Sequence, residues 1–189
     1  GGARVLLCAS TKIFPFQGLT NLKDPSERTL ADALETCPLL CAGNPVPGTG
    51  KLTAPRIPMA RLAALAEYVL AEADGAAGRP LKAHAPHEPV IPPEANQVVC
   101  VVGASGFGRP IGAAAHRPAL YARLAGVLED APAAPETEAA VLLAEGLHDR
   151  VVINQIETAE NRRRAAALAT LLPCPTAGGA LQREEFFVC

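Results

Sequence analysis

Two carboxylates end an apolar stretch near the middle of the chain. Glu72 and Asp74 follow the apolar residues 68–71 and precede Gly75 and a proline-rich stretch. An acid at the end of a buried strand costs desolvation free energy unless it is paired or holds a cation. Nucleotide-binding α/β domains place an acid here to bind Mg²⁺, which takes oxygen ligands. We therefore interpret Glu72 and Asp74 as metal ligands and expect Gly75 to allow a sharp turn; the alternative is an Asp-Gly turn beside a solvated Glu72.

Polar residues also follow two other predicted strands. Thr11 and Lys12 follow Ser10 just beyond the predicted strand at residues 4–9, and Asn154 comes after the apolar residues 151–153. A hydroxyl and a lysine at a strand end suit contacts to phosphate or to Mg²⁺-bound water, although a polar strand exit has the same composition. Asn154 is a candidate contact to a nucleotide base. Together with the two acids, these residues predict a nucleotide site.

Three basic or titratable residues lie in proline-marked segments. Lys82 comes just after the two acids, so it binds an anion or pairs with those acids across the turn. His87 and His116 position a substrate or cap a helix. We include all three among the candidate ligand-binding residues.

Apolar runs alternate with helical patterns along the chain. The runs that predict buried parallel strands are residues 4–9, 39–42, 68–71, 97–102 and 151–153, with helices expected near 25–34, 59–66, 118–124, 136–145 and 158–172. This alternation is typical of an α/β fold with a mainly parallel sheet. We expect one three-layer domain over residues 1–189, with residues 185–189 as an edge strand.

The composition narrows the class of partner. The chain has 189 residues, a net charge of −2 and 49% hydrophobic residues. This charge balance indicates no binding to nucleic acid or to an anionic membrane. Because no apolar run approaches the roughly 20 residues of a membrane span and no signal sequence opens the chain, we expect a cytoplasmic protein. Its partners are then small molecules or proteins.

The six cysteines lack the dense spacing of a disulfide scaffold and favour reduced thiols. One alternative is a zinc site formed by Cys37, Cys41, His84 and His87, because thiolate and imidazole groups suit Zn²⁺. Neither internal spacing is a common zinc-binding spacing, so we favour the reading without zinc.

Several segments together resemble a known family. The stretch at residues 72–92 reads EADGAAGRPLKAHAPHEPVIP, the earlier residues 10–15 read STKIFP, and the later segments read AHRP and VVINQIE. In this order they resemble the YqeC-type accessory proteins of selenium-dependent molybdenum hydroxylases. The most specific part is EADGA-G-PLK followed by HEPVIP. His87 matches the family pattern, whereas His84 stands where the pattern has another residue.

The resemblance implies a P-loop-NTPase-like fold, yet the strand-helix unit that carries the phosphate loop is not found in this sequence. In the family that unit precedes the strand matching residues 4–9, so the chain reads as truncated at its N-terminus. The segment GNPVPGTGK at residues 43–51 does not supply the missing loop, because Leu52 follows Gly50-Lys51. We expect only weak nucleotide binding, no appreciable hydrolysis, and an exposed apolar edge or face that favours self-association.

Two functions follow from the resemblance. The first is a nucleotide-binding factor that uses Mg²⁺ and a nucleoside triphosphate in the maturation of a selenium-dependent molybdenum hydroxylase. The second is a non-catalytic adaptor that presents a molybdenum cofactor or a selenium species to the target enzyme. Neither reading identifies a reaction, and the NQIE sequence at residues 154–157 leaves the base open, because it differs from the N-K-x-D pattern that reads guanine.

Overall fold

The computed structural model describes residues 2–188. The chain divides into two compact units, of which unit 1 contains Gly1–Gly75 and Glu88–Ala95, and unit 2 contains Ala76–His87 and Asn96–Cys189. We describe each unit by itself. The expected single domain over residues 1–189 therefore stays a prediction.

Unit 1 is built on a sheet whose central strands are parallel. Its elements are β1 (Val5–Ala9), β2 (Lys12–Ile13), β3 (Thr20–Lys23), α1 (Glu27–Thr36), β4 (Leu39–Pro45), β5 (Leu52–Thr53), α2 (Met59–Leu65) and β6 (Tyr68–Glu72). The strand order is β2-β5-β4-β1-β6, and β3 also pairs with β4. β1 pairs in parallel with both β4 and β6, while β5 pairs antiparallel with β2 and β4. The expected α/β fold with mainly parallel strands is confirmed.

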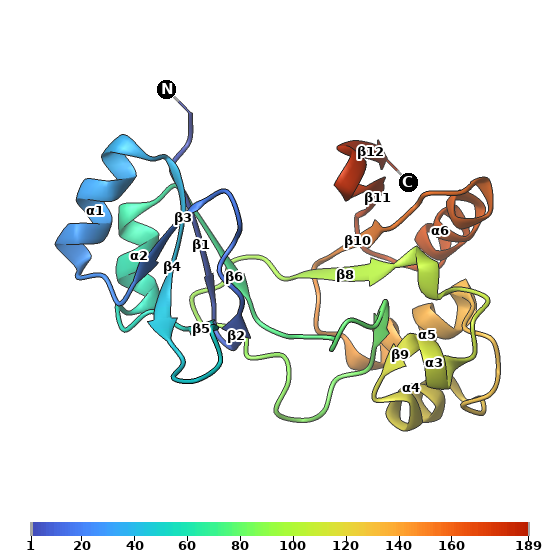
Figure 1. Ribbon diagram of the computed structural model, residues 1–189. Coiled ribbons are helices and arrows are strands. Elements are labelled where there is room, and N and C mark those ends of the chain that lie inside the picture. The colour runs from blue at the N-terminus through green and yellow to red at the C-terminus, as the bar shows by residue number, and fades with distance from the viewer. Residues whose placement is uncertain (1, 189) are drawn as a thin grey trace. The chain divides into compact units, whose positions relative to one another are not determined.

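Both helices of unit 1 cover the same face of this sheet (Figure 1). α1 connects β3 to β4 and α2 connects β4 to β6, so both connections step across the sheet in the same direction. Right-handed crossovers that step in one direction place their helices on one face. The short strand β3 decides this arrangement, and the sequence reading missed it because its residues, TNLK, form no apolar run.

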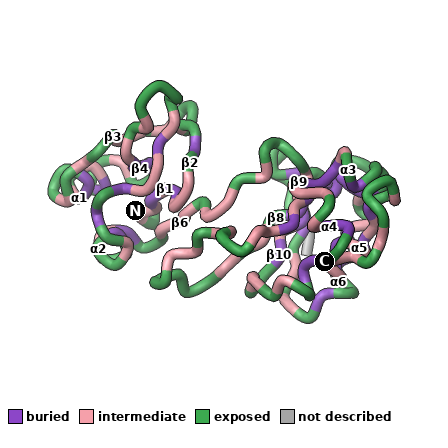
Figure 2. Tube along the Cα trace, turned by 90° about the horizontal axis from the view of Figure 1, so that it is seen from below, coloured by how far each residue is buried: buried purple, intermediate pink, exposed green. Residues whose placement is uncertain are grey.

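The covered face holds the core of unit 1. Leu6 and Cys8 of β1 pack with Leu30 and Leu34 of α1 and with Leu62 of α2. Figure 2 shows buried positions on these helices and on the neighbouring strands. Leu30 and Leu34 lie four residues apart, which puts both on one face of the helix. Helix α1 begins later than the sequence suggested, because Ser26 caps it by accepting a hydrogen bond from Thr29 N–H at 3.1 Å.

Unit 2 has a second, smaller sheet. Its elements are β7 (Leu81–Lys82), β8 (Val99–Gly103), the 3₁₀ turn η1 (Ala104–Gly106), α3 (Ile111–Ala114), β9 (Ala115–His116), α4 (Pro118–Ala125), α5 (Pro135–Glu145), β10 (Arg150–Asn154), α6 (Ala159–Leu171), β11 (Thr176–Ala180), η2 (Leu181–Arg183) and β12 (Glu185–Val188). The order β12-β11-β10-β8 contains parallel pairs of β10 with β8 and β11, and an antiparallel edge strand, β12. The predicted C-terminal edge strand is confirmed for residues 185–188. β11 was not predicted, since its sequence TAGGA has little strand character.

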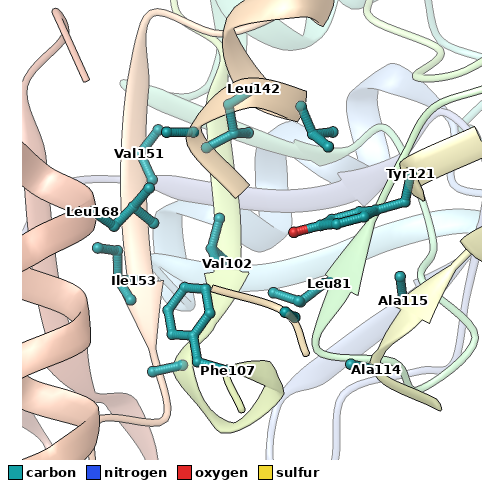
Figure 3. Packing of buried hydrophobic residues seen from close by; sticks show 14 of the residues in the cluster. Leu81, Val102, Phe107, Ala114, Ala115, Tyr121, Leu142, Val151, Ile153 and Leu168 are labelled. Carbon is teal, nitrogen blue, oxygen red and sulfur yellow. The ribbon is translucent and has the colours of Figure 1, made fainter. Parts of the chain in front are cut away.

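The core of unit 2 lies between this sheet and its helices. Val102, Val151 and Ile153 of the strands pack with Leu142 of α5 and Leu168 of α6. Figure 3 shows Tyr121 lying in the same cluster, with its hydroxyl turned inward. The helices therefore form one layer on this sheet, as they do in unit 1.

Each unit by itself has two layers, where the sequence predicted three. On the other face of the unit 1 sheet, Tyr68 and Leu70 of β6 are 59% and 56% exposed. In unit 2, Val99 and Val101 of β8 are 45% and 59% exposed. Apolar strand faces thus remain exposed, as expected, while self-association through them stays a prediction. Among the described residues, no helix is long and apolar enough to cross a membrane.

The core of unit 2 also contains an acid. Glu138 of α5 is 2% exposed and accepts a hydrogen bond from the Tyr121 hydroxyl at 2.8 Å. Burial raises the pKa of the Glu138 carboxyl to about 7; the charge of Glu145 also raises it, while the Tyr121 hydrogen bond and His84 lower it. The protonated acid is therefore the form that the fold favours.

We expect this acid to make the stability of the protein fall between pH 4.5 and about 7. A carboxyl with a raised pKa stabilises the fold fully below its unfolded pKa and loses that contribution as the pH rises through the folded pKa. The loss for Glu138 is on the order of 3 kcal/mol in the free energy of unfolding. Glu138→Gln removes the titrating group, so urea unfolding at several pH values should show a smaller decline in the variant.

Glu136→Gln is the matched control, since Glu136 is exposed in the first turn of the same helix. It should leave the decline with pH unchanged. Equal declines in the wild type and in Glu138→Gln would contradict this assignment.

Candidate functional site

The carboxyl ends of β1 and β6 lie side by side in unit 1. Ala9, the last residue of β1, is opposite Glu72, the last residue of β6. The Ser10 N–H then donates to the Glu72 carbonyl at 3.0 Å. Ligands of open α/β sheets bind outside the carboxyl ends of parallel strands, so this edge is a natural place for a site.

The segment around Val90 is hydrogen-bonded to the same strand ends. The Ser10 hydroxyl donates to the Val90 carbonyl at 2.5 Å, and the Val90 N–H donates to the Ala73 carbonyl at 2.9 Å. Val90 belongs to the HEPVIP stretch, which follows the two acids by more than a dozen residues. The two most specific parts of the family-like sequence therefore meet at one place.

Charged side chains interact at this edge. Partial burial raises the pKa of the Glu72 carboxyl, the negative charge of Asp74 raises it further, and Lys51 lowers it. The Lys51 ammonium also lies 4.8 Å from the centre of the Phe14 ring. Because Glu72 as a whole remains exposed, the two neighbouring charges are the effects that a substitution can test.

The negative charge of Asp74, which raises the pKa of Glu72, also attracts a cation to these two carboxylates. Mg²⁺ is commonly held by one or two carboxylates with waters and phosphate oxygens completing its shell. Glu72 and Asp74 fit this donor set. The described residues contain no group of three or more His, Cys, Asp or Glu side chains that could hold a metal, and Cys8, Cys37, Cys41 and Cys174 form no disulfide.

The other predicted residues of unit 1 are Thr11 and Lys12, which follow β1, and Gly75, which follows Asp74. Thr11 is half-buried, and its carbonyl accepts a hydrogen bond from the Thr53 hydroxyl at 2.7 Å. Lys12 is exposed and begins the short strand β2. Gly75 does not adopt a positive φ, and a Cβ there would meet nothing within 4 Å. The expected sharp turn at Gly75 is therefore wrong, since neither its backbone nor its surroundings require glycine.

Four predicted residues lie in unit 2. Lys82 and His116 are opposite each other in the parallel pair β7–β9, where the Ala83 N–H donates to the His116 carbonyl at 3.2 Å. His87 is exposed at the end of the segment Ala76–His87. Asn154 ends β10 at the carboxyl edge of the second sheet. Within unit 2 the structure thus brings Lys82 and His116 together in the β7–β9 pair. Asn154 lies apart from them, at the end of β10 in the four-stranded sheet.

Asn154 lines a pocket of about 260 Å³ at that edge. The lining residues are Ser105, Asn154, Gln155, Glu157, Thr158, Asn161, Leu181 and Gln182. The sequence pointed to the NQIE segment at residues 154–157, of which Asn154 was the candidate base contact, but it did not point to Ser105, Leu181 or Gln182, which come from distant segments.

The glycine-rich loop at residues 103–108 serves packing. A Cβ at Gly103 would lie 2.7 Å from the Cβ of Pro80, and one at Gly106 would lie 2.7 Å from Leu81. Gly108 faces the Arg164 guanidinium, which donates to the Phe107 carbonyl at 2.6 Å. Side chains therefore occupy the space beside these three glycines.

Sequence reasoning also missed a polar group of residues beneath the helices of unit 2. The Glu145 carboxylate accepts hydrogen bonds from His84 N–H at 2.6 Å and contacts His84 Nδ1 at 2.7 Å. Burial lowers the pKa of nearby His148, while Glu145 and Asp149 raise it.

The burial of Glu138 could have been predicted from the sequence. Glu138 precedes Val141 and Leu142 by three and four residues and so shares their buried helix face.

One comparison with known proteins gave a match. The model of a family described as YqeC protein matches residues 1–119, which is more than half of the chain. This range contains β1, β6, both acids and the HEPVIP stretch. The searches of curated proteins and of solved structures found no match.

The interaction between Glu72, Asp74 and Lys51 can be tested directly. We expect Asp74→Asn to lower the pKa of the Glu72 carboxyl and Lys51→Met to raise it, because the first removes a negative and the second a positive neighbour. A ¹³C NMR titration of the glutamate side chains measures both changes. The control is Asp32→Asn, which replaces an exposed acid on α1 and should leave the pKa of Glu72 unchanged. The assignment would be refuted if neither Asp74→Asn nor Lys51→Met changed the pKa of Glu72.

Proposed function

Because the chain belongs to the YqeC protein family, we propose that it is an accessory factor in the maturation of selenium-dependent molybdenum hydroxylases. We further propose that it binds the Mg²⁺ complex of a nucleotide at Glu72 and Asp74. The observation that supports this most strongly is the position of Glu72, followed two residues later by Asp74, at the carboxyl edge of the parallel strands β1 and β6. The activity of the accessory factor would then depend on this edge of unit 1.

Each residue at the edge has a physical role in this proposal. Glu72 and Asp74 hold the metal ion, which supplies the positive charge that phosphate oxygens need beside two carboxylates. Lys51 offsets part of the negative charge of the acids. Thr11 and Lys12 follow the end of β1 in the chain and would add a hydroxyl and a cation for phosphate.

The loop contacts explain why two distant sequence segments are needed. Ser10 holds Val90 against the end of β6 through its hydroxyl, so the HEPVIP stretch restrains the backbone that carries Glu72. A metal site needs ligands fixed to within a fraction of an ångström, and neighbouring hydrogen bonds provide that restraint. Ser10 and Val90 therefore act as positioning residues.

Metal binding is the first test. Mn²⁺ replaces Mg²⁺ as a paramagnetic probe, and its binding to the chain is followed by electron paramagnetic resonance with and without ATP or GTP. We expect weak binding that nucleotide strengthens, and at least a tenfold loss of affinity in Asp74→Asn, because one of two carboxylate ligands is removed. Asp32→Asn should bind as the wild type does, while equal Mn²⁺ affinity in wild type and Asp74→Asn would overturn the site.

The accessory role needs a separate test in cells that make a selenium-dependent molybdenum hydroxylase. We expect the purified hydroxylase to contain less selenium or molybdenum, by mass spectrometry, when the gene for this protein is interrupted. Restoring the wild-type gene should recover the content, and a gene carrying Asp74→Asn should recover it less. Full selenium and molybdenum content without the protein would contradict the accessory role even if the metal site were correct.

A further inference from the structure

The pocket of unit 2 lies where three strands end. β8 leads into Ser105, β10 ends at Asn154, and β11 leads into Leu181. The parallel pairing of β10 with β8 and β11 brings these ends to one edge of the sheet. The first turn of α6 adds Thr158 and Asn161. Its position is that of a ligand site in an open α/β sheet.

The lining of the pocket favours a neutral occupant over a phosphate. No lysine, arginine or histidine is among the eight lining residues, while Glu157 contributes a carboxylate. A phosphate would meet this negative charge without a compensating cation. A neutral group with several hydrogen-bonding atoms fits this lining better.

Hydrogen bonds fix the amide groups before any ligand arrives. Asn154 Oδ1 accepts from Gln155 N–H at 2.7 Å and from Leu181 N–H at 3.1 Å, which leaves its Nδ2 to donate elsewhere. The Ser105 hydroxyl donates to Gln155 Oε1 at 2.5 Å. Gln155 also has a φ of 63°, a left-handed conformation that is uncommon outside glycine and that concentrates at ligand sites.

We propose that this pocket binds a 2-amino-4-oxopyrimidine ring, the ring that guanine and the pterins share. Such a ring presents a ring N–H and an exocyclic amino group side by side, next to a carbonyl oxygen. The Glu157 carboxylate accepts the two N–H groups, and Asn154 Nδ2 donates to the carbonyl. Leu181, 37% exposed, offers an apolar contact to the ring. A pocket of about 260 Å³ suits one bicyclic ring with a small substituent.

This inference concerns unit 2 alone and does not depend on metal binding at Glu72 and Asp74. Calorimetric titrations of the whole chain with guanosine, 6-hydroxymethylpterin and adenosine test it, in buffer containing a chelator and no Mg²⁺. These probes carry no phosphate, so a failure of the Mg²⁺–nucleotide site leaves the result unaffected. We expect guanosine or the pterin to bind at least tenfold more tightly than adenosine, which lacks the paired N–H groups.

Two substitutions locate the binding. Glu157→Gln removes one acceptor, and Asn154→Asp keeps the oxygen that holds Gln155 and Leu181 while it removes the amide donor. Each should weaken binding at least tenfold. The controls are Glu136→Gln and Gln97→Ala, both exposed and outside the pocket, and they should bind as the wild type does. Thermal unfolding confirms that each variant is folded.

The outcomes distinguish between a guanine nucleotide and a pterin as the ligand. Tighter binding of guanosine identifies a guanine nucleotide as the ligand class, and tighter binding of the pterin identifies a pterin cofactor. Binding of neither compound would overturn the proposal. Equal binding of adenosine, or binding that both pocket substitutions leave unchanged, would also overturn it.

Discussion

The handedness of the strand connections is the constraint on which both units depend. In unit 1 the connections from β3 through α1 to β4, and from β4 through α2 to β6, step in one direction; in unit 2 the connections from β8 to β10 and from β10 through α6 to β11 do the same. Right-handed crossovers of this kind put their helices on one face of the sheet. The parallel pairing of the strands that they connect puts the carboxyl ends of these strands at one edge. As a consequence, each sheet has one buried face. The candidate polar residues lie at or beyond the carboxyl ends of its parallel strands.

The two edges differ in charge, and this difference separates the ligands that they suit. The edge of unit 1 combines Glu72 and Asp74 with Lys51, so it favours a cation and the phosphates that a cation brings. The pocket of unit 2 combines amides and hydroxyls with one carboxylate, so it favours a neutral ring with N–H donors. The family match covers residues 1–119 and thus supports only the first edge. The second edge is argued from its own geometry.

Buried polar groups in unit 2 show how packing sets local chemistry. Glu138 is held in the core by the Tyr121 hydroxyl, and burial raises its pKa to about 7. Beside it, Glu145 ties His84 to the end of α5 through two contacts. Removing one partner from such a group leaves a buried polar atom unpaired, which typically costs about 1–3 kcal/mol. These hydrogen bonds therefore connect α4, α5 and the segment that contains His84.

The sequence by itself determined the local elements and the character of the first site. Continuous apolar runs predicted β1, β4, β6, β8 and β10, because such runs are typical of parallel strands, although one face of β6 and of β8 proved to be exposed. The two acids at the end of β6 stood out because apolar residues precede them. Only the tertiary structure decided what depends on pairing between distant segments. Short strands such as β3 and β7 have no periodic signal of their own, since partner strands supply their hydrogen bonds. The single helical layer of each unit follows from those pairings, as does the pocket that gathers Ser105, Asn154 and Leu181, because strand order and crossover direction are properties of the assembled sheet.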